Sequence, residues 1–174
     1  MRGFISICFS LLVLVSVAQA QTTMQQVFVV KQAFPSIKTI GVLCNTQNAA
    51  KILKELTVAG SSYSVEFVIY DVKTVQDLRQ QFESLTGARK IDLLWMVQDG
   101  VADDRFGRRF LEEKSISNKI PLFTYSTDFV KEGSLMTVSV DASSQIKIFY
   151  NRKVSQMLGI SFPAELQEKL TPVD

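Results

Sequence analysis

Hydrophobic positions along this chain follow two alternating patterns. Short, almost unbroken apolar runs recur, among them "IGVLC", "VEFVIYDV", "IDLLWMV" and "PLFTY", and between them lie stretches whose apolar residues return every three or four positions. The first pattern is typical of strands buried on both faces, and the second of helices with one buried face. We therefore expect strands at 38–44, 64–71, 91–97, 120–125 and 134–140, helices at 47–59, 74–86, 102–116 and 142–158, and a short turn or helix at 127–132.

The regular alternation of strand and helix predicts an α/β fold. Because right-handed crossovers join parallel strands, the most economical arrangement is a three-layer, flavodoxin-like doubly wound sheet of five mainly parallel strands in the order 2-1-3-4-5. The fifth segment, "LMTVSVD", alternates between apolar and polar residues, which favours an edge position in the sheet.

The first twenty residues have the features of a secretory signal peptide. Arg2 supplies a positive start, "FISICFSLLVLVSV" an apolar core, and Ala18 to Ala20 an A-x-A cleavage motif. We expect an exported, periplasmic protein that begins near Gln21 after cleavage. A retained membrane anchor is the alternative, although the apolar run of about 14 residues is shorter than the roughly 20 that cross a bilayer.

These boundaries predict one folded domain, because the 154 residues that remain after cleavage (174 minus 20) suffice for a single core and not for two full lobes. The expected division is a signal peptide at 1–20, an N-terminal segment with a helix at 21–35, a single α/β lobe at 36–158 and a C-terminal tail at 159–174.

Charge narrows the possible partners of the chain, and cysteine content narrows its possible disulfides. The 174 residues include 19 Lys and Arg against 17 Asp and Glu, a formal net charge of +2, so charge predicts no binding to nucleic acid or to an anionic membrane. Cys44 is the only cysteine after residue 20, so no disulfide is expected within the exported chain. At the end of an apolar run, Cys44 is expected to be a small core residue.

The residue types present argue against an enzyme. Histidine is absent, which removes Ser-His-Asp and Cys-His arrangements. One thiol without imidazole excludes a zinc site of ordinary composition, and neither G-x-G-x-x-G nor G-x-x-x-x-G-K-[ST] occurs, so nucleotides are poor candidates. We expect no catalytic residue, no metal and no cofactor.

Polar residues at the ends of the expected strands form the candidate binding site. Ligands of doubly wound sheets lie beyond the carboxyl ends of the strands, near the switch in strand order. The residues that follow the strands there include Asn45, Thr46, Asp99, Ser126 and Asp141. Each also has a plainer interpretation as a helix cap, because short polar side chains satisfy the unpaired N–H groups of a first helical turn.

Several stretches resemble, in order and spacing, one half of the periplasmic substrate-binding proteins of the ABC-transporter group related to the tryptophan/tyrosine-binding type. The likeness runs from Phe28 to Leu158. In it, "CNTQN" is similar to a Tyr-Asn-Pro-type turn, "QDGVA" to an Asp-Asn turn and "VKEGSL" to a Val-Lys-x-Gly-Ala-Leu stretch. The resemblance implies a type I periplasmic-binding fold, in which two lobes close around an amino-acid-like ligand and present it to a membrane permease.

The chain also departs from that family. It carries one such lobe where the family has two, so a clamshell is not expected within one chain. Thr46 stands at the proline of the first turn, Gly100 at the asparagine of the second, and Ile146 at a family glycine. The resemblance therefore carries ligand contacts over only to Asn45, Asp99, Ser126 and Asp141.

Two hypotheses of function stay open. In the first, the lobe binds a small amino-acid-like ligand for an envelope transport or sensory system. The N–H groups at 45–47 hold the ligand's carboxylate, Asp99 or Asp141 holds its amine, and a homodimer could close two rims face to face.

In the second hypothesis, the lobe binds no ligand and contacts an envelope protein, such as a permease or receptor, through its rim or its C-terminal tail. The apolar side chains of that tail must cover this domain, pair in a dimer or dock on a partner: Ile160, Phe162, Leu166 and Leu170.

Overall fold

A computed structural model describes residues 22–140 and 145–173 of the chain. The expected signal peptide therefore lies outside the described residues. The helices and strands are α1 (Thr23–Ala33), β1 (Thr39–Cys44), α2 (Ala50–Tyr63), β2 (Glu66–Asp71), η1 (Val75–Asp77), α3 (Leu78–Ala88), β3 (Leu93–Trp95), α4 (Arg105–Asn118), β4 (Leu122–Phe123), α5 (Thr127–Glu132), β5 (Met136–Val140), β6 (Ile146–Asn151), α6 (Arg152–Leu158), η2 (Ala164–Lys169) and β7 (Leu170–Val173).

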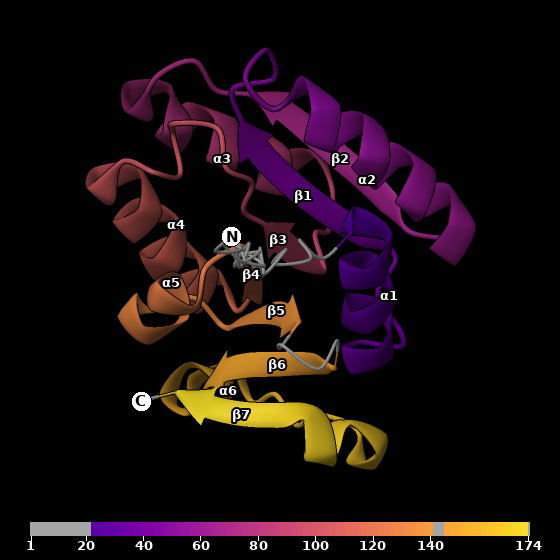
Figure 1. The fold of residues 1–174 in the computed structure, drawn as a ribbon. Coiled ribbons are helices and arrows are strands. Elements are labelled where there is room, and N and C mark those ends of the chain that lie inside the picture. Colours follow the sequence, from indigo (N-terminus) through magenta and orange to yellow (C-terminus); the bar gives the residue numbers. More distant parts are fainter. Residues whose placement is uncertain (1–21, 141–144, 174) are drawn as a thin grey trace, which may run out of the picture.

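The strands form one sheet in the order β2-β1-β3-β4-β5-β6-β7 (Figure 1). Strands β1 to β5 pair in parallel, β6 pairs antiparallel with β5, and β7 pairs parallel with β6. The α/β class and the order 2-1-3-4-5 are thus confirmed for the first five strands. The sheet has seven strands rather than five, and β5 lies inside it rather than at its edge.

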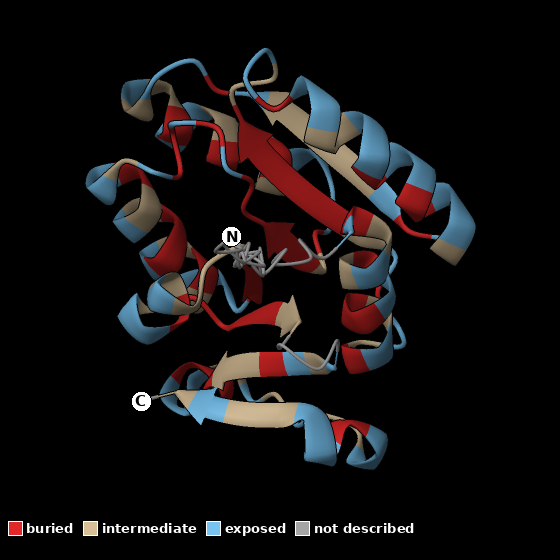
Figure 2. Cartoon of the chain, viewed as in Figure 1, coloured by how far each residue is buried: buried red, intermediate tan, exposed pale blue. Residues whose placement is uncertain are grey.

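Helices cover both faces of the sheet, as the unbroken apolar strands predict. One core cluster joins Val27 of α1 and Leu56 of α2 to Trp95 of β3. The other joins Phe82 of α3 and Leu111 of α4 to strand residues of the opposite face. Figure 2 shows these buried residues along the central strands and on the inner sides of the helices. Within the described ranges no helix is both long and apolar enough to cross a membrane.

The segment expected to be a single helix at 142–158 is divided. Residues 146–151 form β6, and only 152–158 form helix α6. The sequence "IKIFYN" is rich in β-branched and aromatic residues, and residues 146–150 of β6 pair one by one with β5. Asn151, the last residue of β6, is also the N-cap of α6, because its side chain accepts the N–H of Val154 at 3.0 Å.

The expected C-terminal tail is part of the fold. Leu166 of η2 is 2% exposed and belongs to the core cluster on the α1 face. The ring centroid of Phe162 lies 6.1 Å from that of Phe34 and 5.3 Å from that of Tyr150. β7 then extends the sheet beside β6. Of the three possibilities for the tail's apolar residues, the structure shows that they cover this domain.

Because Leu166 is fully enclosed, we expect Leu166→Ala to lower the free energy of unfolding by about 2–4 kcal/mol. Its exposed neighbour Glu165 provides the matched control, and Glu165→Ala should change stability by less than about 0.5 kcal/mol. Urea denaturation followed by circular dichroism measures both changes. A Leu166→Ala midpoint equal to that of the parent protein would mean that the tail does not contribute to the core.

Candidate functional site

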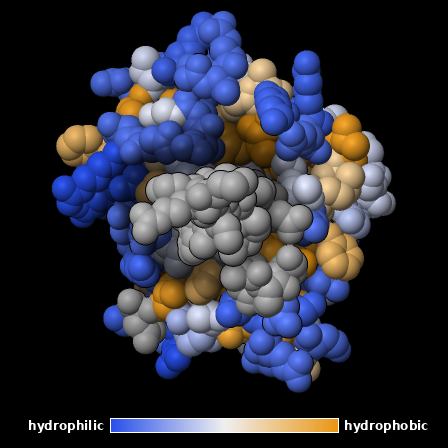
Figure 3. Space-filling view, in the orientation of Figure 1, coloured by the Kyte–Doolittle hydropathy of each residue, from blue (hydrophilic) through white to orange (hydrophobic). Residues whose placement is uncertain are grey.

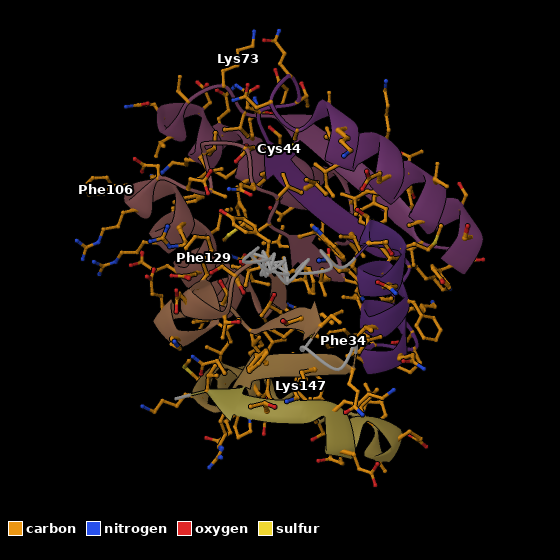
Figure 4. The ribbon with its side chains drawn as sticks, in the orientation of Figure 1. Phe34, Cys44, Lys73, Phe106, Phe129 and Lys147 are labelled. Atoms are coloured by element: carbon orange, nitrogen blue, oxygen red, sulfur yellow. The ribbon has the colours of Figure 1, made fainter. Side chains whose placement is uncertain are left out.

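The candidate site lies at the carboxyl ends of β1, β3 and β4, where two turns meet. The first turn follows Cys44, the last residue of β1, which Figure 4 labels. The side chain of Asn45 accepts the N–H groups of Gln47 at 3.1 Å and of Asn48 at 3.2 Å. This Asx turn folds the chain toward α2, so the N-cap character expected of Asn45 appears here as a turn that precedes the helix.

Asp99 joins this first turn to the turn that follows β3. One carboxylate oxygen of Asp99 accepts the N–H of Asn45 at 2.6 Å, and the other accepts the N–H groups of Val101 and Ala102 at 3.0 and 2.9 Å. The side-chain amide of Asn48 donates in return to the backbone carbonyl of Asp99 at 2.9 Å. With three N–H donors and only 5% of its surface exposed, Asp99 acts as a buried clamp between the turns.

Asp71, at the end of β2, holds the next residue of the first turn. Its carboxylate accepts the backbone N–H of Thr46 at 3.0 Å and the Thr46 hydroxyl at 2.8 Å. These hydrogen bonds lower the pKa of Asp71, the backbone N–H contributing most. Thr46 therefore takes part in a contact between strands β1 and β2 at the exposed rim.

The N–H groups expected to hold a ligand carboxylate already have acceptors within the chain. Asn45 donates to Asp99, Thr46 to Asp71, and Gln47 to the side chain of Asn45. A ligand carboxylate would have to displace one of these acceptors to bind there. Two aspartates of the protein thus occupy the positions where we expected a ligand anion.

The remaining expected residues lie farther along the rim. The Ser126 hydroxyl accepts the N–H of Asp128 at 3.3 Å and so caps α5, in line with its plainer interpretation. Asp141 lies outside the described residues. Next to Ser126, the Tyr125 hydroxyl donates to the carboxylate of Asp103, and burial together with that carboxylate raises the pKa of Tyr125, so its hydroxyl stays protonated.

A cavity of about 500 Å³ opens beside these turns, between α1, α2 and the carboxyl end of β3. We call it the rim cavity. Trp95, Met96 and Val97 give it an apolar side. The other lining residues, mostly polar, are Thr23, Gln26, Asn48, Lys51, Ile52, Glu55, Gln98 and Tyr125.

Of the five residues first expected at the site, the four that the structure describes do not line this cavity. Gln98 and Asn48 are close in the sequence to expected residues, so the cavity lies at the edge of the sheet where the sequence placed the candidate site. Lys51 lies one helical turn after Asn48, a spacing that a helix beginning at the turn could have revealed. No sequence pattern indicated that Thr23 would line the cavity, because α1 reaches the cavity only through its packing against α2.

The thiol of Cys44 is enclosed beneath the first turn. Burial, followed by the negative charges of Asp99 and Asp71, raises its pKa to about 12, so the thiol stays protonated at neutral pH. Cys44 is therefore a core residue, as its position in the sequence predicted. In the part of the chain that the structure describes, no group of three or more His, Cys, Asp or Glu residues could hold a metal ion.

The family model for ABC transporter substrate binding proteins matches residues 13–158 of the chain. The chain belongs to this family. That membership confirms the resemblance of "CNTQN" and the other stretches to one lobe of a substrate-binding protein. A comparison with curated proteins found no match.

Three solved structures share the fold of this substrate-binding lobe. An ABC domain in complex with L-Trp from Streptococcus pneumoniae has a TM-score of 0.74 at 21% identity. A conserved domain protein from Vibrio cholerae has a TM-score of 0.72 at 19% identity. An open, ligand-free substrate-binding protein with adhesive properties from Clostridium difficile has a TM-score of 0.75 at 22% identity.

The matches differ greatly in how much of each protein they include. They cover 87%, 87% and 88% of this chain but only 60% of each solved structure. The chain thus spans about three fifths of the length of those proteins. At these identities the likeness shows the fold alone.

A second cavity of this lobe, of about 600 Å³, lies on α4 and contains a buried acid. Glu112 is 7% exposed and accepts the hydroxyl of Ser134 at 3.1 Å. Burial raises the pKa of Glu112 to about 7, although the Ser134 hydrogen bond opposes this shift. Nearby, the Nε atom of Arg108 lies 2.7 Å from the Glu132 carboxylate, and its Cζ atom lies 4.1 Å from the ring centroid of Phe129. The positive charge of Arg108 therefore interacts with both groups.

If Asp99 is a clamp, its removal must destabilise the fold. We expect Asp99→Ala to lower the free energy of unfolding by about 3 kcal/mol, because three N–H donors lose a charged acceptor. Asp71→Ala removes the exposed carboxylate at the end of β2 that holds Thr46 of the first turn, and its effect should be clearly smaller. Urea denaturation at pH 7 compares the two variants. A negligible loss of stability in both variants would contradict the role of Asp99 as a clamp.

Glu112 should make stability depend on pH. Its folded pKa of about 7 exceeds the ordinary 4.5, so as pH rises from 4.5 to about 7 the unfolded state releases the proton first and folding becomes less favourable by about 3 kcal/mol. Glu112→Gln keeps an acceptor for Ser134 and removes this loss. The stability gained by the variant, measured by urea denaturation, should therefore grow from about pH 4.5 to about pH 8. A gain that does not change with pH would contradict the assignment.

Proposed function

We propose that this substrate-binding lobe is exported to the periplasm and binds a small amino-acid-like ligand in the rim cavity for an envelope transport or sensory system. The observation that carries the proposal is the composition of that cavity at the carboxyl edge of the sheet. It combines an apolar wall at Trp95 with the ammonium group of Lys51 and polar groups of Gln98 and Tyr125. Doubly wound sheets bind ligands at this edge, and about 500 Å³ is within the usual size of such sites.

The groups around the cavity suit an amino acid in both charge and polarity. Lys51 has no ion-pair partner among the described residues, so its ammonium group is available to a ligand carboxylate. Glu55, which accepts the Thr23 hydroxyl, supplies the opposite charge for an amine. The apolar side chain of the ligand would then lie over the small exposed part of Trp95 and Val97, each 3% exposed, and beside Ile52. The L-Trp complex of the Streptococcus pneumoniae relative supports a ligand of this class.

The residues first expected at the site have two roles in this proposal. Asn45, Thr46 and Asp99 shape the turns that border the cavity and do not contact the ligand through their own polar groups. Ser126 and Asp141 stay proposed ligand contacts on the side of the rim that follows β4 and β5. The ligand also needs a cover, because good sites enclose most of a small molecule's surface. A second copy of the chain or an envelope partner supplies it.

A specific observation favours a second candidate function. The N–H groups of Asn45, Thr46 and Gln47 are already bound to acceptors of the chain, so the turn offers no ready cradle for a ligand carboxylate. In this alternative the lobe is an interaction module, and its rim contacts a permease or receptor without a ligand between them.

A thermal-shift scan against the amino acids tests the first proposal. A ligand at a hundred times its Kd stabilises the fold by about 2.7 kcal/mol, which raises the Tm by several degrees. We expect one chemical class of amino acid to produce this shift and Lys51→Ala to weaken its binding by about ten-fold or more, since a hydrogen bond to a charged group is lost.

Lys90 provides the matched control for this experiment. It is exposed and precedes β3, at the opposite edge of the sheet from the rim cavity, so Lys90→Ala should bind as the parent protein does. A scan without any shift from a folded sample would reject ligand binding and favour the interaction module. Binding that survives Lys51→Ala unchanged would reject the rim cavity as the site.

A further inference from the structure

Helices α1 and α2 pack side by side and present a face whose centre is apolar. Two large apolar side chains stand out of it: Phe28 is 40% exposed and Val58 is 60% exposed. The ring of Phe28 lies 5.6 Å from that of Tyr63, so Phe28 packs against α2. Figure 3 shows hydrophobic atoms among hydrophilic ones on the side of the molecule where these helices lie. We call this surface the α1–α2 face.

Lysines flank the apolar centre at both ends. A cavity of about 570 Å³ is lined by Lys51 and Lys54 together with Val58. Another, of about 630 Å³, is lined by Lys31 and Lys38. None of these four lysines forms an ion pair within the described residues.

The acidic residues near this face are already engaged. Glu66 forms an ion pair with Arg89, and Glu55 accepts the Thr23 hydroxyl but keeps its negative charge. Four lysines against this one carboxylate leave the α1–α2 face with a positive charge, although the chain as a whole is nearly neutral at +2.

The position of the preceding segment in the chain bears on what this face meets. Thr22 and Thr23 line the same cavity as Lys51 and Lys54. The apolar run that ends at Val17 precedes Thr22 by five residues, which span at most about 17 Å. Where that run is retained as a membrane anchor, Thr22, at the Lys51 and Lys54 end of the α1–α2 face, lies within about 17 Å of the bilayer.

We propose that the α1–α2 face binds the surface of an anionic lipid bilayer. Phe28 and Val58 enter the headgroup region, and the four lysines contact lipid phosphates, the arrangement that amphipathic surfaces use to associate with membranes without crossing them. A second copy of the chain is a poor occupant, because two such faces would bring four lysines against four lysines. The proposal does not depend on ligand binding in the rim cavity.

Binding to vesicles tests this proposal. The protein purified after export is sedimented with phosphatidylglycerol-rich vesicles and, separately, with phosphatidylcholine vesicles. We expect binding to the first that weakens with added salt, and little to the second. Lys38→Gln combined with Lys54→Gln, which leaves the rim cavity untouched, should lower binding about 25-fold, since each lysine near an anionic surface contributes about five-fold.

Controls come from the opposite side of the molecule. Phe106 is 77% exposed and points into solvent from α4 (Figure 4), so Phe106→Ser reports non-specific hydrophobic adsorption. Lys119→Gln, at the end of α4, combined with Lys153→Gln, in α6, removes the same charge as the test variant from other elements. Both controls should bind as the parent protein does, whereas Phe28→Ser combined with Val58→Ser should bind several-fold more weakly.

Three results would overturn the proposal: no binding to anionic vesicles, equal binding to neutral ones, or equal losses in the test and control lysine variants. Self-association that depends on Phe28, without vesicle binding, would instead assign the face to a second copy. Because the lysine substitutions are on the surface, their Tm should match that of the parent protein, and the comparison stays valid if the Phe28 variant folds poorly.

Discussion

The carboxylate of Asp99 holds together the two turns on which the rim depends. It accepts N–H groups from Asn45 on one side and from Val101 and Ala102 on the other, with almost no exposure to water. Strands β1 and β3 pair through only two residue pairs, so this side-chain link continues their contact beyond the sheet. The hydrogen bonds to this carboxylate stabilise the fold, because without it the three N–H groups would lack an acceptor.

The clamp also changes what the rim offers to a ligand. In a doubly wound fold, free N–H groups after a strand are a ready anion site. Here the chain's own Asp71 and Asp99 fill that role at Thr46 and Asn45. The groups left available are side chains of α2 and of the turns, such as Lys51 and Gln98, and they surround a cavity with an apolar wall. In the proposed site, ligand recognition therefore rests on side chains more than on backbone.

The C-terminal residues complete the domain in a way that an isolated tail could not. β6 and β7 extend the sheet past β5, and Leu166 and Phe162 pack against the core and against α1. The same helix α1 lines the rim cavity through Thr23 and forms half of the charged α1–α2 face. Helix α1 thus contacts the C-terminal residues, lines the rim cavity and forms part of the proposed membrane-binding α1–α2 face.

The sequence by itself determined the first five strands, the helices between them and their order, because unbroken apolar runs and helical periodicity report burial locally. It placed Cys44 in the core and proposed a site at the edge of the sheet where the rim cavity lies. It could not distinguish strand from helix in "IKIFYN", where apolar residues fit both periods; pairing with β5 decided that segment.

The signal peptide expected at 1–20 and the ligand contacts expected at Ser126 and Asp141 stay predictions. Only the tertiary structure decided which N–H groups were occupied, which residues reached the cavity and where four lysines gathered. These depend on distances between residues far apart in the chain, such as Asn45 and Asp99, and no local pattern encodes them.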